Sequence, residues 1–161
     1  MTRSTSRLQQ ELQQSRPFRS IYQEAALSLL KTADLLRRSL STRLEPHGIT
    51  PQQYNVLRVL RGAGPEGIPT LAIGERLIEE TPGLTRLLDR LETKGLALRR
   101  RCPQDRRQVL CFLTPEGGRL LDILQPSVDS LEQLFAEAIS TPEAERLVQL
   151  LERIRERQHN Q

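Results

Sequence analysis

With 161 residues, 37% of them hydrophobic and 3% aromatic, the chain suits one compact domain whose core comes mainly from leucine, a composition typical of helix-rich proteins. It has no apolar stretch near the roughly 18 residues that cross a bilayer, no signal-peptide core and no metal-knuckle cysteine spacing, which excludes membrane and secreted classes and predicts a soluble cytoplasmic protein. The net charge of +4 is unevenly placed, because residues 81–107 carry eight basic and three acidic side chains, and this segment therefore predicts an anionic partner.

The N-terminal part predicts a polar arm and one long helix. Residues 1–17 are rich in Gln, Arg and Ser and offer little to bury, so we expect a loose or partly helical arm. Residues 18–48 predict an amphipathic helix, since apolar side chains recur every three or four positions before a proline and a glycine end the pattern. The stripe consists of Ile21, Ala25, Leu29, Ala33, Leu36, Leu40 and Leu44.

Residues 49–113 have the outline of a winged helix-turn-helix. Three short helices are expected over 50–62, 70–78 and 81–95. Each opens with a threonine that can cap it, and almost no residues separate the second from the third, which is typical of a helix-turn-helix. Two β-prone runs, 96–101 and 108–113, frame a charged turn and predict a hairpin, the wing.

Residues 114–161 predict two more amphipathic helices, opened by Thr114 with Pro115 and by Thr141 with Pro142. Their stripes are Leu120, Leu124, Val128, Leu131 and Phe135, then Leu147, Leu150, Leu151 and Ile154. The apolar stripes exceed what a three-helix reading head can cover, so part of them should be buried in a partner subunit. The expected fold is one compact domain, mainly α with a small β-hairpin wing, in which N- and C-terminal dimerisation helices flank the winged helix-turn-helix.

The fourth predicted helix has two distinct faces. Leu84, Leu87, Leu88 and Leu91 share one face, which leaves Thr85, Arg86, Asp89 and Arg90 on the other. The start of the helix, from Thr81 to Arg86, combines unpaired backbone N–H groups with a positive helix dipole, and Pro82 and Gly83 are small enough to permit close approach to DNA. An ordinary solvated surface helix would show the same pattern, and the neighbouring hairpin favours DNA binding.

The predicted wing tip carries Asp105, Arg106 and Arg107. Its arginines could reach the minor groove or the phosphates, while Asp105 could hold one of them in a bidentate pair. The alternative is a polar turn with a local ion pair, but an exposed pair contributes only about 0–1 kcal/mol to stability. We therefore favour contact with DNA.

Three stretches resemble the MarR family of bacterial winged-helix regulators: ITPQQYNVLRVL at 49–60, TPGLTRLLDRLETKGLALRR at 81–100 and DRRQVLCFLTPEG at 105–117. The last fits the family pattern of Asp-x-Arg, five residues and Leu-Thr-x-x-Gly. The resemblance implies a homodimer with intertwined terminal helices that binds double-stranded DNA at a near-palindrome, with half-sites about 10 bp apart. It implies a transcriptional regulator, a repressor released by a small molecule, although no residue decides between repression and activation.

The resemblance also implies which residues contact DNA. They are Thr81, Pro82, Gly83, Thr85, Arg86 and Arg90 on the recognition helix, and Asp105, Arg106 and Arg107 on the wing. Many relatives are released by a small aromatic or phenolic acid, and others by oxidation of a cysteine in the first helix. Because no cysteine precedes Cys102, that sensor layout is not expected; Cys102 and Cys111 are interpreted as hairpin residues, with Cys102 the more exposed to reaction.

Two other functions are alternatives to DNA binding. An enzyme is suggested only by Gly62, Gly64 and Gly67, which spell G-x-G-x-x-G inside a predicted interhelical loop rather than a strand–turn–helix unit. His47 and His159 lack the partners of a triad or a metal site, so neither catalysis, a cofactor nor a metal is expected. The other rival is a helical interaction module whose arginines only keep the surface solvated; it explains the stripes but not the wing.

Overall fold

The computed structural model describes residues 6–103, 105 and 107–159, and the chain divides into two compact units, Met1–Thr42 and Arg43–Gln161. The first unit contains helix α1 (Arg7–Glu11) and nearly all of helix α2 (Ile21–Leu44). Helix α2 begins at Ile21 rather than Phe18, because the Ser20 hydroxyl accepts a hydrogen bond from the backbone N–H of Gln23 at 3.1 Å and so caps the helix start.

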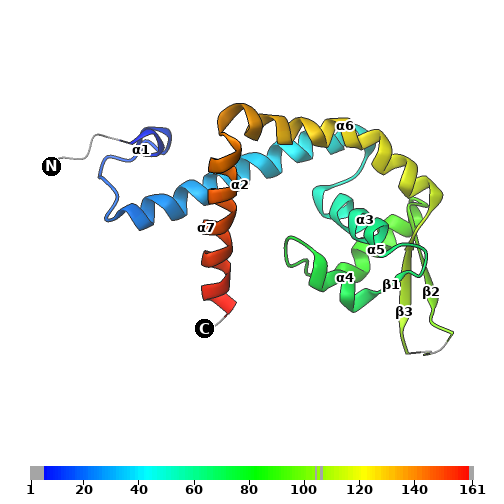
Figure 1. Cartoon of the computed structure of the whole chain (residues 1–161). Helices are drawn as coiled ribbons and strands as arrows, with labels where there is room; N and C mark the ends of the chain where they lie inside the picture. Colours follow the sequence, from blue (N-terminus) through cyan, green and yellow to red (C-terminus); the bar gives the residue numbers. More distant parts are fainter. Residues whose placement is uncertain (1–5, 104, 106, 160–161) are drawn as a thin grey trace. The chain divides into compact units, whose positions relative to one another are not determined.

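The second unit holds the remaining helices and all described strands. In chain order they are the 3-10 helix η1 (Glu45–His47), α3 (Pro51–Ala63), β1 (Ile68–Pro69), α4 (Thr70–Arg76), α5 (Leu84–Thr93), β2 (Ala97–Arg101), β3 (Val109–Leu113), α6 (Pro115–Ala138) and α7 (Thr141–His159). In Figure 1, α3, α4 and α5 gather beside the strands, and α6 leads away from the wing toward α7. The predicted fold class, mainly helical with a small β wing, is confirmed.

Two helix starts follow directly from the sequence. Thr50 and Gln53 form a complete capping box at the start of α3, with Pro51 in the first turn. Thr114 caps α6, since its hydroxyl accepts from the N–H of Gly117 at 3.0 Å and donates to the carbonyl of Gly95 at 2.7 Å. The second bond ties the start of α6 to the end of the recognition helix.

In the helix-turn-helix, the predicted end of the first helix and the predicted start of the second helix were wrong. Helix α4 stops at Arg76, and α5 starts only at Leu84, so a seven-residue loop over 77–83 separates them. Gly83 lies in the left-handed region (φ 85°), a conformation that helix residues do not adopt. Thr81 donates to the carbonyl of Glu79 at 3.2 Å instead of capping a helix. Thr70 does not cap α4 either, because its hydroxyl lies against β3, 3.4 Å from the sulfur of Cys111.

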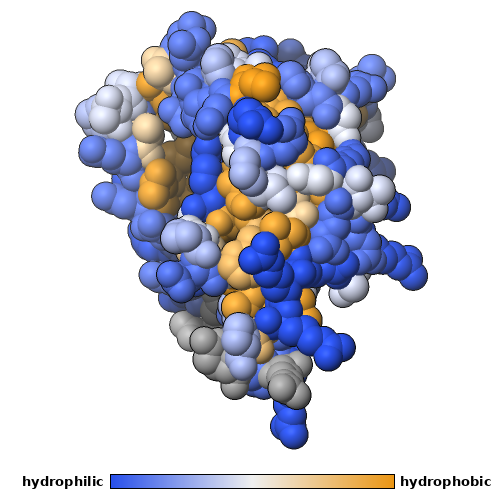
Figure 2. Space-filling view, turned by 90° about the vertical axis from the view of Figure 1, so that its right-hand side faces the viewer, coloured by the Kyte–Doolittle hydropathy of each residue, from blue (hydrophilic) through white to orange (hydrophobic). Residues whose placement is uncertain are grey.

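The wing is a three-stranded antiparallel sheet in the order β1-β3-β2. The predicted hairpin is present, but the segment interpreted as an interhelical loop also contributes β1, which pairs Ile68 with Cys111. Pro69 is tolerated because β1 is an edge strand. Gly67 (φ 71°) permits this pairing, since a Cβ there would collide with the ring of Phe112. In Figure 2, which faces the sheet side, apolar side chains form a central band flanked by hydrophilic ones.

The buried core lies within the winged helix and the first half of α6. Its fully buried side chains include Leu44, Val56, Leu57, Leu60, Ile73, Leu88, Leu91, Cys111, Leu121 and Leu124. Most are leucines, as the composition predicted. They come from both helices of the helix-turn-helix, the wing, α3, α6 and the last residue of α2, so the position of the recognition helix is fixed by this shared core.

The long terminal helices leave large apolar side chains exposed. Tyr22 (82%) and Leu30 (66%) on α2 are examples, and Ile123, Val148 and Ile154 on α6 and α7 are each more than half exposed. Within the described residues, no helix is long and apolar enough to cross a membrane. The exposed apolar side chains of α2, α6 and α7 form stripes whose contact with water is unfavourable.

Candidate nucleic-acid interface

Helix α5 has the two faces that the sequence predicted. Leu88 and Leu91 are fully buried in the core, whereas Thr85, Arg86 and Arg90 are exposed. Because the helix starts at Leu84, its unpaired N–H groups are those of its own first turn, and Thr81, Pro82 and Gly83 lie in the preceding loop. These predicted DNA-contact residues are thus adjacent to the helix start rather than on the helix.

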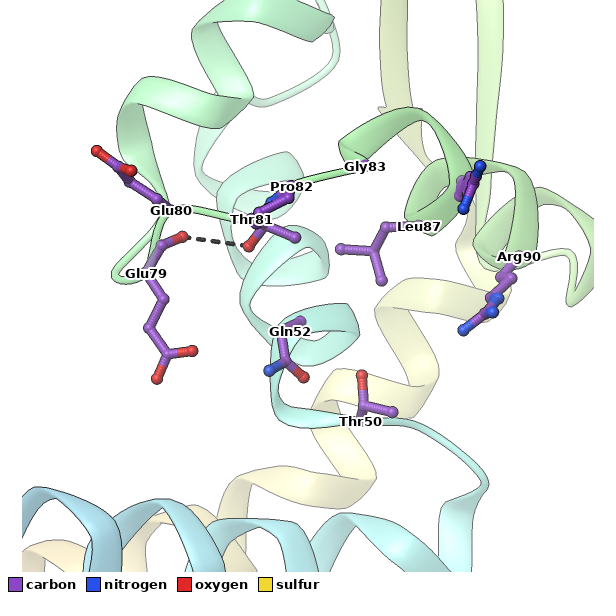
Figure 3. A pocket seen from close by; sticks show the side chains of 10 residues that line it. Thr50, Gln52, Glu79, Glu80, Thr81, Pro82, Gly83, Leu87 and Arg90 are labelled. Atoms are coloured by element: carbon purple, nitrogen blue, oxygen red, sulfur yellow. Dashed lines mark hydrogen bonds between the residues drawn. The ribbon is translucent and has the colours of Figure 1, made fainter.

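A groove of about 460 Å³ lies between the start of α3, the loop over 77–83 and α5. Its lining consists of Thr50, Gln52, Glu79, Glu80, Thr81, Pro82, Gly83, Arg86, Leu87 and Arg90. Figure 3 shows Leu87 directed into it, with Thr50 and Gln52 on the α3 side and Arg90 on α5. Three predicted contact residues of the loop and two of α5 therefore meet in one concave surface, together with the start of α3.

Two arginines, Arg86 and Arg90, line this groove. Among the described residues, the side chains of Arg86 and Arg90 make no hydrogen bond or ion pair. Arginine presents a planar fork that can donate two parallel hydrogen bonds to a phosphate or a guanine edge. With Arg86 beside the N-terminus of α5 and Arg90 in its last turn, two exposed guanidinium groups give the groove the chemistry of an anion-binding surface.

Arg99 on β2 binds two carboxylates of α5. Its backbone N–H and Nε each donate to the Glu92 carboxylate at 2.7 Å, and its terminal nitrogen forms ion pairs with Glu92 and with Asp89. The hydrogen bond with Glu92 is the main cause that raises the pKa of Arg99. Sequence reasoning counted Arg99 with the other basic residues and missed this link, because Glu92 and Arg99 meet only after the chain turns at Gly95.

The wing tip carries exposed charge. Arg107 is exposed, and its backbone N–H donates to the Asp105 carboxylate at 3.0 Å, so Asp105 organises the turn. The predicted contact residue Arg106 lies outside the described residues. Further up the strand, the guanidinium of Arg100 lies 5.9 Å from the centre of the Phe112 ring, which is a cation–π geometry.

The cysteines and histidines do not form a metal or catalytic cluster among the residues that the structure describes. Cys111 is fully buried, and this burial raises the pKa of its thiol, which disfavours the nucleophilic thiolate; Cys102 is half-buried. His47 lies in η1, and the side chain of His159 is outside the described part of the chain. Within the described ranges, no three His, Cys, Asp or Glu side chains are grouped as metal ligands.

Sequence comparison identifies the family to which this winged helix belongs. The MarR family model matches residues 49–109, which span α3 to the start of β3. The transcriptional regulator HosA of Escherichia coli O111:H- is 32% identical over 106 residues, which cover 66% of this chain and 77% of HosA. The chain belongs to the MarR family.

Solved structures of MarR-family proteins agree with this assignment. A MarR transcription factor from Planctomyces limnophilus is 38% identical, with a TM-score of 0.64 over 84% of this chain and 98% of that one. A mutant MarR from Escherichia coli complexed with operator DNA is 29% identical, with a TM-score of 0.72 over 80% of this chain and 91% of that one. The chain is thus a MarR-family transcriptional regulator with a winged-helix DNA-binding fold.

Membership of the MarR family favours a regulator over the alternative function as an enzyme. Its relatives are transcription regulators, which are not enzymes. The glycines of the G-x-G-x-x-G string have structural positions: Gly62 lies inside α3, Gly64 ends that helix and Gly67 packs against Phe112. They do not form the strand–turn–helix cradle that holds a dinucleotide.

Proposed function

We propose that this MarR-family protein binds a near-palindromic operator as a homodimer, with α5 in the major groove and the wing in the flanking minor groove. The observation that carries the proposal is the pair Arg86, in the first turn of α5, and Arg90, in its last turn, which both line the groove, are exposed and have no ion pair among the described residues. The operator complex of the relative supports it. We assign the DNA contacts to Thr81, Pro82, Gly83, Thr85, Arg86, Arg90, Asp105, Arg106 and Arg107.

The dimer is supported by the exposed apolar stripes of α2, α6 and α7. Phe135 (38%), Leu147 (40%) and Ile154 (54%) would cost less free energy against a second subunit than against water. We therefore assign residues 18–48 and 114–161 to dimerisation and residues 49–113 to DNA binding. Two-fold symmetry then requires two half-sites about one helical turn, roughly 10 bp, apart.

Titration of the purified protein against the DNA upstream of its own gene tests the proposal, with a scrambled duplex as the control at two salt concentrations. We expect much tighter binding to the native fragment, protection of a near-palindrome, and an affinity that falls steeply with salt because bound arginines release counterions. The rival interaction module predicts no binding at low salt.

Regulation by a ligand is a further part of the proposal. We infer a repressor whose operator complex is released by a small aromatic or phenolic acid, as the family resemblance implies. The same titration, repeated with salicylate as the probe, should then show weaker operator binding at unchanged salt. Unchanged affinity across a panel of such acids would contradict this part and leave DNA binding intact.

The wing makes a separate prediction. Replacing Arg107 with alanine should weaken binding to operator and scrambled duplex about equally, and should reduce the slope of log affinity against log salt by about 1, because one phosphate contact is lost. Arg16→Ala, an exposed arginine in the N-terminal segment that we assign neither to dimerisation nor to DNA binding, is the control and should leave the slope unchanged. A wild-type slope for Arg107→Ala would contradict the wing assignment.

A further inference from the structure

Arg99 joins the two elements that we assign to DNA binding. It lies on β2 of the wing, and both of its carboxylate partners, Asp89 and Glu92, lie on α5. The Glu92 carboxylate accepts from the backbone N–H and from Nε of Arg99, both at 2.7 Å, while a terminal nitrogen of Arg99 lies 2.6 Å from Glu92 and also contacts Asp89. One guanidinium thus bridges the recognition helix and the wing.

Asp89 occupies an unfavourable place for a carboxylate. It lies on the polar face of α5 between Arg86 and Arg90, and its side chain is 53% exposed. Duplex DNA carries one negative charge per roughly 1.7 Å of axis, so a carboxylate on a helix in the major groove is repelled unless a cation compensates it. Arg99, with 24% of its side chain exposed, is the cation that contacts Asp89.

A lysine could not make the same set of contacts. The planar guanidinium presents several N–H donors in fixed directions, and here they serve two carboxylates at once. Partly exposed ion pairs contribute little to folding stability, so stability alone is a weak reason for this arrangement.

We propose that Arg99 is a positioning residue for DNA binding, which holds the wing at a set orientation to α5 and compensates the charge of Asp89 at the DNA surface. The inference rests on the proposed operator binding. Arg99 itself need not touch DNA: its effect on affinity passes through Asp89, Glu92 and the wing strand that carries it.

A double-mutant cycle tests this role, with Arg99→Met, Asp89→Asn and the double variant as full-length proteins. Methionine keeps much of the length of the side chain and removes its charge. We expect Arg99→Met to bind the operator at least about tenfold more weakly, because the carboxylates are left uncompensated. Adding Asp89→Asn should restore most of that loss, which a purely structural role of Arg99 would not predict. Urea unfolding confirms that each variant is folded.

Two results would overturn the inference: wild-type operator affinity in folded Arg99→Met, or a double variant as weak as the single one. Should Arg99→Met not fold, Arg99→Lys replaces it, and the loss of the planar fork should still weaken binding by about threefold; wild-type affinity of Arg99→Lys would equally overturn it. Failure of the wild-type protein to bind any operator fragment would instead count against the proposed function, so the two failures are distinguishable.

Discussion

Replacing Arg86 with alanine is expected to weaken operator binding by about 1–3 kcal/mol, or roughly 5- to 150-fold, if its guanidinium reads a base edge. The side chain is exposed in the groove at the start of α5 and makes no ion pair among the described residues, so alanine removes a contact with DNA and no contact within the protein. Folding stability should therefore change little. Fluorescence anisotropy with the operator duplex measures the affinity, and urea unfolding measures the stability.

The pattern of loss separates base reading from phosphate contact. A base-reading Arg86 should lose affinity for the operator and much less for a scrambled duplex, so that the specificity ratio falls. Arg16→Ala is the control, because it removes an exposed arginine outside the segments assigned to dimerisation and DNA binding and should leave the ratio unchanged. An Arg86→Ala protein with the wild-type ratio would show that Arg86 does not read sequence.

Gly117→Ala is expected to lower the free energy of unfolding by about 2–3 kcal/mol, toward the upper end of what overpacking costs. Gly117 lies in the first turn of α6, whose capping residue Thr114 is hydrogen-bonded to Gly95, just after the end of α5. A Cβ at this position would stand against the backbone carbonyl oxygen of Leu96, closer than van der Waals contact allows, and 2.7 Å from a methyl carbon of Leu113. A backbone atom cannot rotate away as a flexible side chain can, so α6 must shift.

The adjacent glycine provides the matched control for this prediction. A Cβ on Gly118 would meet nothing nearer than a methyl carbon of Leu113 at 4.0 Å. Because alanine is the better helix former, Gly118→Ala should raise the free energy of unfolding by about 0.5–1 kcal/mol. Urea unfolding at one fixed protein concentration measures both, since the stability of a dimer depends on concentration. Equal stability of the two variants would contradict the predicted close packing of Gly117.

Local spacing along the chain was enough to predict the helical elements and the two faces of the recognition helix. Leucines at 84, 87, 88 and 91 can share a side only on a helix, and the structure accordingly buries Leu88 and Leu91 and exposes Arg86 and Arg90. Thr50 and Thr114 were identified as helix caps because capping is a local interaction within three or four residues. The wing motif with its Leu-Thr-x-x-Gly ending likewise indicated the family before any contact was known.

Features that depend on contacts between distant segments are visible only in the folded protein. The start of α5 was placed too early because the left-handed conformation of Gly83 follows from how the loop over 77–83 meets the helix, and Thr81 and Pro82 fit a helix start equally well in sequence. Strand β1 exists because β3 offers it an edge about 40 residues away. The basic residues of 81–107 look alike in sequence, yet Arg99 is bound to Glu92 and Asp89, while Arg86 has no ion pair among the residues that the structure describes. That difference arises because an ion pair forms only where folding brings opposite charges within contact distance, and spacing along the chain does not fix that distance.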